Sequence, residues 1–313
     1  MKTGIIGAGS WGTALACVLN KNGHEVTLWG YNEEDVIYMQ QELENKKFLP
    51  EVILDKKIKI TNREDDLKDV ELVVFAVPSV VVRENAKRFS GILNNSNKII
   101  VNVAKGIEAD TLLTLTEVIK SEIPECNIAV LSGPSHAEEV GKGLPTTCVA
   151  GCEDIKIAHT IQEAFMNESF RIYTNTDVIG IEIAGAFKNL IALATGASDG
   201  CGFGDNIKAA IMTRGIAEIT RLGISMGANK ETFAGLTGVG DLIVTCTSEH
   251  SRNRQAGFLI GQGKSLDETL EEIKMVVEGV NTAKAAKQLA EKNGIDMPIT
   301  REINEVLFNN KNI

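Results

Sequence analysis

One six-residue string near the start of the chain constrains its fold more than any other feature. Gly7-Ala8-Gly9-Ser10-Trp11-Gly12 matches the pattern G-x-G-x-x-G, follows an apolar run at residues 3–6 and precedes residues with helical spacing. One glycine permits a tight turn, another lets the backbone approach a pyrophosphate, and the third allows close helix packing. The helix start adds oriented N–H donors. The context favours a dinucleotide-binding turn over a glycine-rich turn without a ligand.

Short apolar runs alternate with helix-patterned segments in the first half of the chain. The runs lie at residues 26–29, 72–77, 99–103 and 128–131, and helical patterns cover residues 80–93 and 112–123. This alternation predicts an α/β fold with a Rossmann-type, mostly parallel sheet and helices on both faces. After about Tyr173 helical patterns dominate. We predict a dinucleotide-binding domain over residues 1–175 and an all-helical substrate and catalytic domain over residues 176–313.

Composition excludes several other classes of protein. The 32 Lys and Arg against 42 Asp and Glu give a net charge of −10, which disfavours nucleic acid and anionic membranes as partners. No apolar run approaches the ~18 residues of a membrane span, so no membrane insertion is expected. The six scattered cysteines include no C-x-x-C pair and indicate a reducing cytoplasm. The four histidines are isolated, and we predict no metal site.

The end of the second predicted strand bears on the choice of cofactor. An NAD-selective site usually has Asp or Glu there to bind the ribose hydroxyls. This chain has Gly30, Tyr31 and Asn32, so no acid repels a 2′-phosphate and no arginine binds one. Glu33, which comes slightly later, is expected to begin a solvated helix. NAD and NADP both remain open, with tolerance of NADP favoured.

Other predicted strand ends carry residues that suit a ligand crevice. In such sheets ligands bind beyond the carboxyl ends of the strands, where Val77-Pro78-Ser79, Ala104-Lys105-Gly106 and Ser132-Gly133-Pro134-Ser135 lie. Lys105 is the only cation among them. We favour a site lysine over an ordinary surface lysine in a turn.

A lysine in an apolar helical segment is the strongest catalytic candidate. Between residues 183 and 194 only Lys188 and Asn189 are strongly polar, so the predicted helix is buried nearly all round. Small side chains at Ala184 and Ala192 share the face of Lys188 and leave room for a ligand. Desolvation lowers a lysine pKa towards the range useful for proton transfer. The alternative is a lysine whose stem packs while its ammonium reaches water.

Two polar strings further on could bind a phosphate. Gly238-Val239-Gly240-Asp241 leads to Thr245, and Ser251-Arg252-Asn253-Arg254 follows where a helix is expected to begin. A serine cap, helix N–H groups and an arginine fork together suit a phosphate. A solvated basic turn explains the second string equally well.

Taken in order, these strings resemble bacterial NAD(P)-dependent glycerol-3-phosphate dehydrogenase. The matching strings also include Leu131-Ser132-Gly133-Pro134-Ser135, Ala186-Phe187-Lys188-Asn189 and Val277-Glu278-Gly279. The resemblance implies an enzyme that reversibly reduces dihydroxyacetone phosphate to sn-glycerol 3-phosphate with NADPH or NADH and supplies glycerophospholipid synthesis. It also implies a cytoplasmic homodimer.

The resemblance implies three sets of site residues. The catalytic set is Lys188, Lys105 and Asp241. The substrate-binding set is Lys105, Gly133, Ser135, Asn189, Asp241, Thr245, Ser251, Arg252 and Asn253. The cofactor-binding set is Gly7, Gly9, Ser10, Trp11, Gly12, Tyr31, Lys105, Ala137, Arg252, Val276 and Glu278. Tyr31 departs from the family, which often has a basic or imidazole side chain there.

Two other functions remain open from the sequence. One is a related two-domain dehydrogenase of another small hydroxy substrate, because a fold does not fix a substrate. The other is a non-catalytic sensor of nicotinamide nucleotides. A sensor has no need of a proton donor on a buried helix, so Lys188 favours an enzyme.

Overall fold

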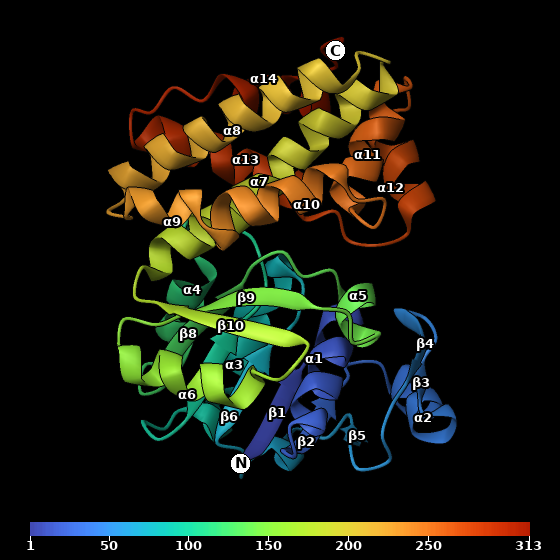
Figure 1. Ribbon diagram of the computed structural model, residues 1–313, viewed down its shortest axis with the longest axis vertical. Helices are drawn as coiled ribbons and strands as arrows, with labels where there is room; N and C mark the ends of the chain where they lie inside the picture. Colours follow the sequence, from blue (N-terminus) through green and yellow to red (C-terminus); the bar gives the residue numbers. More distant parts are fainter. The chain divides into compact units, whose positions relative to one another are not determined.

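The computed structural model describes residues 1–313, which form two compact units (Figure 1). The first unit comprises residues 1–104 and 116–178, and the second comprises residues 105–115 and 179–313. The domain boundary predicted at residue 175 puts residues 105–115 in the first domain. They join the second unit because Ile107 is buried in its hydrophobic core and pairs with Thr114 across a short loop.

An eight-stranded sheet forms the centre of the first unit. The strands, in spatial order, are β10 (Phe170–Asn175), β9 (Thr146–Gly151), β8 (Asn127–Ser132), β7 (Ile99–Asn102), β6 (Leu72–Phe75), β1 (Lys2–Ile6), β2 (Glu25–Trp29) and β5 (Lys59–Thr61). All neighbours are parallel except β8 and β9. The predicted mostly parallel, Rossmann-type sheet is confirmed.

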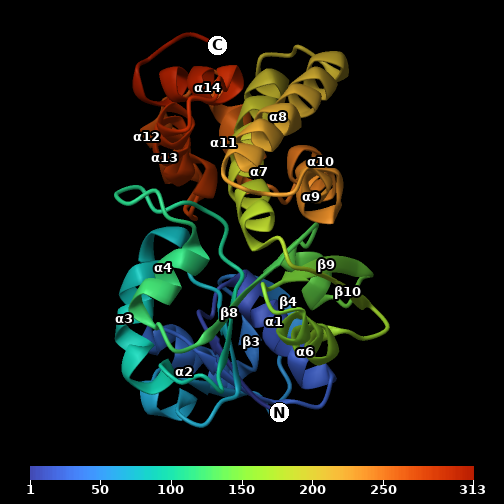
Figure 2. The same cartoon turned by 90° about the vertical axis from the view of Figure 1, so that its left-hand side faces the viewer.

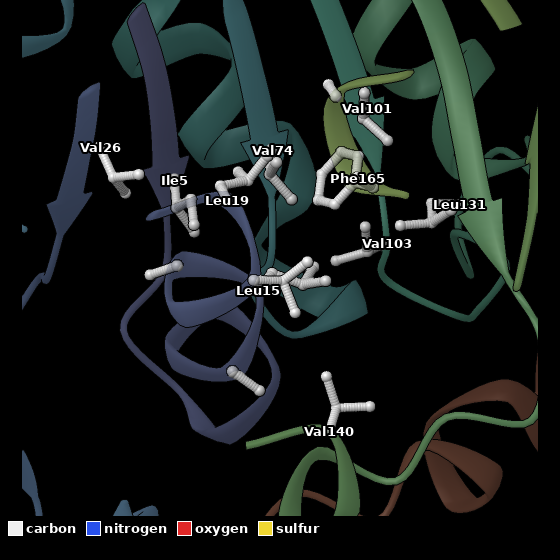
Figure 3. Close-up of a cluster of buried hydrophobic side chains, with 14 of the residues drawn as sticks. Ile5, Leu15, Leu19, Val26, Val74, Val101, Val103, Leu131, Val140 and Phe165 are labelled. Carbon is white, nitrogen blue, oxygen red and sulfur yellow. The ribbon is translucent and has the colours of Figure 1, made fainter. Parts of the chain in front are cut away.

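Apolar strand residues and amphipathic helices explain how this sheet is covered. All four residues of β6 are fully buried. Figure 2 shows α1 and α6 on one side of the sheet and α3 and α4 on the other. Leu15 and Leu19 of α1 and Phe165 of α6 pack against strand residues such as Val74 (Figure 3). The helices of this unit are α1 (Ser10–Lys21), α2 (Glu33–Glu42), α3 (Val82–Leu93), α4 (Leu115–Glu122), α5 (Ala137–Gly141) and α6 (Ile155–Phe165), with single 3₁₀ turns at Glu64–Leu67 and Ser79–Val81.

Five strands were not predicted from the sequence. β5 has three residues, and β3 (Glu44–Asn45) and β4 (Leu49–Ile53) form a separate small hairpin. β10 is an edge strand and alternates buried with exposed residues, and β9, which lies next to it, begins with two threonines. A search for continuous apolar runs therefore does not find them.

The glycine turn lies where the strand order reverses. After β1 the chain builds β2 and β5 on one side, and then β6 on the other side of β1. Gly7 has φ +114°, and a Cβ on it would lie 2.5 Å from the carbonyl oxygen of Ala76, just after β6. A Cβ on Gly12 would lie 1.9 Å from the carbonyl oxygen of Gly7. The turn therefore needs glycine at both positions.

The second unit is all-helical, as predicted, and is built around one long helix. Its elements are α7 (Val178–Gly200), α8 (Asp205–Ser225), α9 (Lys230–Ala234), a π-helical turn (Leu236–Gly240), α10 (Asp241–Thr247), α11 (Arg252–Gly261), α12 (Leu266–Ile273), α13 (Glu278–Lys292) and α14 (Pro298–Phe308). Residues 180–198 of α7 are buried throughout. Apolar residues of α8, α10, α11, α13 and α14 join those of α7 in one core.

Helix α7 corrects one expectation from the sequence. It is the one helix long and apolar enough, by length and composition alone, to cross a membrane, whereas no such segment was expected. However, 83% of its most apolar stretch is buried inside the protein. Helix α7 is therefore the core helix of the second unit.

Replacement of Gly12 by alanine tests the turn. A Cβ there has no room beside the Gly7 carbonyl oxygen, and backbone must move to admit it. We expect Gly12→Ala to lower the free energy of unfolding by roughly 1–3 kcal/mol, measured by urea titration. The matched control is Gly91→Ala in α3, where a Cβ meets nothing within 4 Å and alanine should add about 0.5–1 kcal/mol. Equal effects at the two positions would contradict the packing argument.

Candidate active site

The glycine turn fits the pyrophosphate of a dinucleotide. A Cβ on Gly9 would meet nothing within 4 Å, so the space beside this backbone is open, in contrast to Gly7 and Gly12. Gly9 is the N-cap of α1 and has no side chain to accept from the first-turn N–H groups of Ser10 and Trp11. These N–H groups have no partner within the helix and suit an anion. The turn therefore leaves room for a pyrophosphate to approach the backbone and offers it N–H hydrogen-bond donors.

A buried asparagine, which no sequence motif indicates, holds this turn in place. The side-chain amide of Asn45, at the start of the β3–β4 hairpin, donates to the Ala8 carbonyl oxygen at 2.9 Å and to Thr13 Oγ1 at 2.7 Å. Asn45 is 3% exposed. Because it lies more than thirty residues from its partners, no local pattern in the sequence predicts this contact.

The end of β2 carries no acidic side chain. Tyr31 is 74% exposed, and Asn32 is the N-cap of α2, where its side chain accepts from the Asp35 N–H at 2.9 Å. Glu33 begins α2, as predicted. No carboxylate at residues 30–32 opposes a phosphate on the adenosine ribose.

Three side chains form a buried ionic cluster in the second unit. The Lys188 ammonium, on α7, donates to Asp241 Oδ1 and, at 2.7 Å, to Thr245 Oγ1. Lys105 Nζ donates to the other oxygen of Asp241 at 2.7 Å. The side chains of Lys188 and Asp241 are 7% and 1% exposed, and that of Lys105 is 21% exposed. The ammonium of Lys188 is therefore enclosed, which excludes the alternative that it reaches bulk water.

Local structure places each member of the cluster. Asp241 is the first residue of α10, directly after the π-helical turn, and Thr245 follows one turn later on the same face. Lys105 precedes the loop that Ile107 anchors in the core of the second unit. Three segments far apart in the sequence thus meet at one carboxylate.

The electrostatics of the cluster suit proton transfer. Burial is the main reason why the pKa of Lys188 falls from 10.5 to about 7; Asp241 opposes this shift and Lys105 adds to it. Burial by itself raises the pKa of Asp241, but the ammonium groups of Lys105 and Lys188 outweigh burial and leave that pKa below its ordinary value. The cluster therefore pairs an ionised carboxylate with a lysine that can gain or lose a proton near neutral pH.

A second group of predicted substrate residues lies where α11 begins. Ser251 is the N-cap of this helix, as predicted, and its hydroxyl accepts from the Arg254 N–H at 3.3 Å. Arg252 Nη1 donates to the Val276 carbonyl oxygen at 3.3 Å. Asn253 donates to Asn189 Oδ1 at 3.0 Å, next to Lys188 in the sequence.

Two further contacts bear on the phosphate site predicted at Ser251-Arg252-Asn253-Arg254. Asn253 also accepts from the Gly279 N–H at 2.8 Å, which brings the start of α13, with Glu278, to α11. Arg254, in contrast, donates twice to Asp199 on α7, at 3.1 and 2.8 Å. Arg254 therefore joins α11 to α7, and Arg252 is the arginine of this string with a side chain available for a ligand.

The remaining predicted site residues lie in the first unit. Gly133 follows β8 with φ +149°, and Ser135 Oγ donates to its carbonyl oxygen at 3.0 Å. Ala137 begins α5, whose residues pack against α1. These residues thus belong to the same unit as the glycine turn, whereas the lysine cluster and the α11 group belong to the second unit.

The fold and the two groups of residues define a class of protein. A glycine turn at the switch point of a parallel sheet, followed by an all-helical unit with a buried lysine and carboxylate, is the arrangement of a two-domain dinucleotide-dependent oxidoreductase. Residues 2–158 match the N-terminal family model of NAD-dependent glycerol-3-phosphate dehydrogenase, and residues 177–313 match the C-terminal family model. The chain belongs to the NAD-dependent glycerol-3-phosphate dehydrogenase family.

Individual relatives agree over the whole chain. Glycerol-3-phosphate dehydrogenase [NAD(P)+] of Fusobacterium nucleatum is 51% identical over 100% of this chain and 94% of its own length. The enzyme of the same name from Agathobacter rectalis is 54% identical over 99% and 92%. The crystal structure of glycerol-3-phosphate dehydrogenase from Coxiella burnetii superposes with a TM-score of 0.95 at 36% identity, covering 99% of this chain and 95% of that one.

These similarities confirm the predicted enzyme class and its cofactor. The chain is an NAD(P)-dependent glycerol-3-phosphate dehydrogenase by family, and NAD or NADP is its nucleotide. A non-catalytic sensor and a dehydrogenase of another hydroxy substrate are not favoured.

The buried ammonium gives the stability of the protein a characteristic pH dependence. The unfolded chain holds the Lys188 proton up to the ordinary pKa of 10.5, whereas the folded chain releases it at a pKa of about 7. Between these values the unfolded state binds more protons, so native stability rises with pH by up to about 1.4 kcal/mol per unit. In urea titrations, the free energy of unfolding of the wild type minus that of Lys188→Met should rise from pH 7 to 9. A constant or falling difference contradicts the assignment.

Proposed function

We propose that this chain reduces dihydroxyacetone phosphate reversibly to sn-glycerol 3-phosphate with NADPH or NADH, and so supplies glycerophospholipid synthesis. The single observation that supports the mechanism is the buried cluster of Lys188, Asp241 and Lys105. In this proposal residues 1–175 bind the dinucleotide and residues 176–313 bind the substrate and provide the catalytic groups. Lys105, in the loop that packs with the second unit, also belongs to the catalytic set.

The nucleotide site in this proposal uses the glycine turn and the residues around it. The open backbone at Gly9 and the N–H groups at the start of α1 receive the pyrophosphate. The further contacts proposed for the cofactor are Gly7, Ser10, Trp11, Gly12, Tyr31, Lys105, Ala137, Arg252, Val276 and Glu278. When bound, the reduced nicotinamide supplies the hydride for the carbonyl carbon.

Lys188 completes the reduction by supplying a proton. As the carbonyl carbon gains its hydride, negative charge grows on the oxygen, and the Lys188 ammonium donates a proton to that oxygen to give the alcohol. Lys105 adds a second positive charge that stabilises the developing alkoxide. In the reverse direction neutral Lys188 accepts the hydroxyl proton. A pKa of about 7 lets one residue serve both directions near neutral pH.

Asp241 is the positioning group of this mechanism. Its two oxygens hold the two ammonium groups in a fixed geometry, and its charge neutralises one of them. The cluster therefore retains one net positive charge when both lysines are protonated. That positive charge attracts the negative oxygen of the alkoxide, and the attraction is stronger in a buried site than in water.

The phosphate of the substrate is assigned to the start of α11. Arg252 and the Ser251-capped helix N-terminus provide a charged fork and N–H donors. The proposed substrate set also includes Gly133, Ser135, Asn189, Thr245 and Asn253. Phosphate binding away from the reacting carbon orients the carbonyl and so contributes to the rate.

Removal of the Lys188 ammonium tests the proton-transfer step. We expect Lys188→Ala to lower kcat by about 10²–10⁴-fold, because the proton donor is lost, while the dissociation constant for the nucleotide changes little. Steady-state kinetics and a fluorescence titration with NADPH measure the two quantities. The control is Lys98→Met, which removes the other buried lysine, one that donates to two backbone carbonyls of the first unit. Comparable kcat values for the wild type and Lys188→Ala would rule out this role.

A substrate without the phosphate tests the assignment of Arg252. We expect Arg252→Ala to lower kcat/KM for dihydroxyacetone phosphate by roughly 10–100-fold, because a charge-assisted hydrogen bond contributes about 1.5–3 kcal/mol. With dihydroxyacetone, which lacks the anion, the variant should lose much less activity, because only the proposed contact of Arg252 with the cofactor is then removed. Arg214→Ala, an exposed arginine on α8, is the control. The assignment fails if Arg252→Ala reduces both substrates' rates by the same factor.

We also propose that the chain works as a cytoplasmic homodimer. The resemblance to the family supports the dimer, and six free cysteines support a reducing compartment. A sedimentation mass equal to one 33.8 kDa chain would contradict the dimer.

A further inference from the structure

An arginine from helix α3 lies against the tip of strand β2. The guanidinium carbon of Arg88 is 5.1 Å from the ring centroid of Tyr31 and 5.7 Å from that of Trp29. Arg88 Nε pairs with Glu64 Oε1 at 3.4 Å. Trp29 is 2% exposed and packs edge-on against Phe89, whereas Tyr31 is 74% exposed. The guanidinium thus contacts one buried ring and one exposed ring, whose centroids are 6.4 Å apart.

The position of Arg88 is significant because of what the end of β2 does in this fold. In dinucleotide-binding domains the residues after the second strand contact the 2′ position of the adenosine ribose, where NAD has a hydroxyl and NADP a phosphate. Trp29 is the last residue of β2, and Tyr31 lies two residues beyond it. The rings that hold Arg88 therefore mark the place where the two nucleotides differ.

The geometry of the guanidinium suits a phosphate there. Cation–π contact with two rings reduces the freedom of the side chain, and Glu64 occupies Nε. No hydrogen-bond partner is found for the two terminal nitrogens, which form the planar fork that binds phosphate oxygens in pairs. Of the three acidic residues in the first turn of α2, Asp35 pairs with Lys47 at 2.8 Å.

We propose that Arg88 determines cofactor specificity by binding the 2′-phosphate of NADP(H). This inference rests on the proposed nucleotide site and adds the residue that distinguishes the two nucleotides. Tyr31 has no positive charge of its own, but its ring contacts a cation supplied by α3. Glu64 orients the guanidinium and also opposes part of its charge.

Binding of nucleotide fragments tests the proposal without turnover. Isothermal titration calorimetry of the full-length protein with adenosine 2′,5′-bisphosphate and with 5′-ADP separates the 2′-phosphate from the rest of the site. Arg88→Gln should weaken binding of the bisphosphate about tenfold or more and change that of 5′-ADP less than twofold. Glu64→Gln should strengthen bisphosphate binding. Lys87→Gln, an equal change of charge at the preceding exposed position of α3, is the matched control.

The outcomes separate this proposal from the one on which it rests. If the wild type binds 5′-ADP and Arg88→Gln weakens both fragments equally or neither, Arg88 does not read the 2′ position and the proposal is wrong. If the wild type fails to bind 5′-ADP, the proposed nucleotide site itself is wrong, and this inference with it.

A second variant keeps the proposal testable if Arg88→Gln does not fold. Arg88→Lys retains the charge but loses the planar fork and should lose part of the preference for the bisphosphate. An unchanged preference in a folded Arg88→Lys protein, verified by circular dichroism, would overturn the role of the fork.

Discussion

A carboxylate buried between two ammonium groups is the interaction on which the second unit depends. Removing ions from water costs several kcal/mol each, and only close opposite charges and further hydrogen bonds offset this cost. Asp241 pairs with both lysines, and Thr245 provides Lys188 with a further oxygen. The apolar surroundings of α7 create this cost, and the π-helical turn ends directly before Asp241, the residue that offsets it.

The same requirement explains the path of the chain. Lys105 follows the strand β7 of the first unit, yet its ammonium must reach a carboxylate 136 residues later in the sequence. The loop that follows is fixed in the second unit by Ile107, by its pairing with Thr114, and by the Glu108 N–H donating to the Leu113 carbonyl oxygen at 3.0 Å. Because residues 105–115 pack in the second unit, Lys105 lies beside Asp241 as the second lysine of the cluster.

Local patterns predicted most of the fold and singled out Lys188 and Lys105 as candidate site residues. The glycine string, the apolar strands and the lysine within an apolar helix can each be recognised from a few neighbouring residues in the sequence. The sequence therefore indicated the mostly parallel sheet, the helical second half and the burial of Lys188. It did not reveal that Asn45 fastens the glycine turn or that Arg254 binds Asp199, because both contacts depend on segments that only the fold brings together.

The choice between NAD and NADP likewise depends on residues that are far apart in the sequence. Residues 30–32 carry no charge of either sign. By themselves they neither attract nor repel a 2′-phosphate. Yet the potential at a site is the sum over all neighbours within about a Debye length of 8–10 Å, whatever their position in the sequence. Arg88 reaches the tip of β2 from a helix 57 residues beyond Tyr31, in a chain whose total charge is −10. In this proposal one oriented cation, placed by packing against aromatic rings, makes an acidic protein favour the more anionic of the two nucleotides.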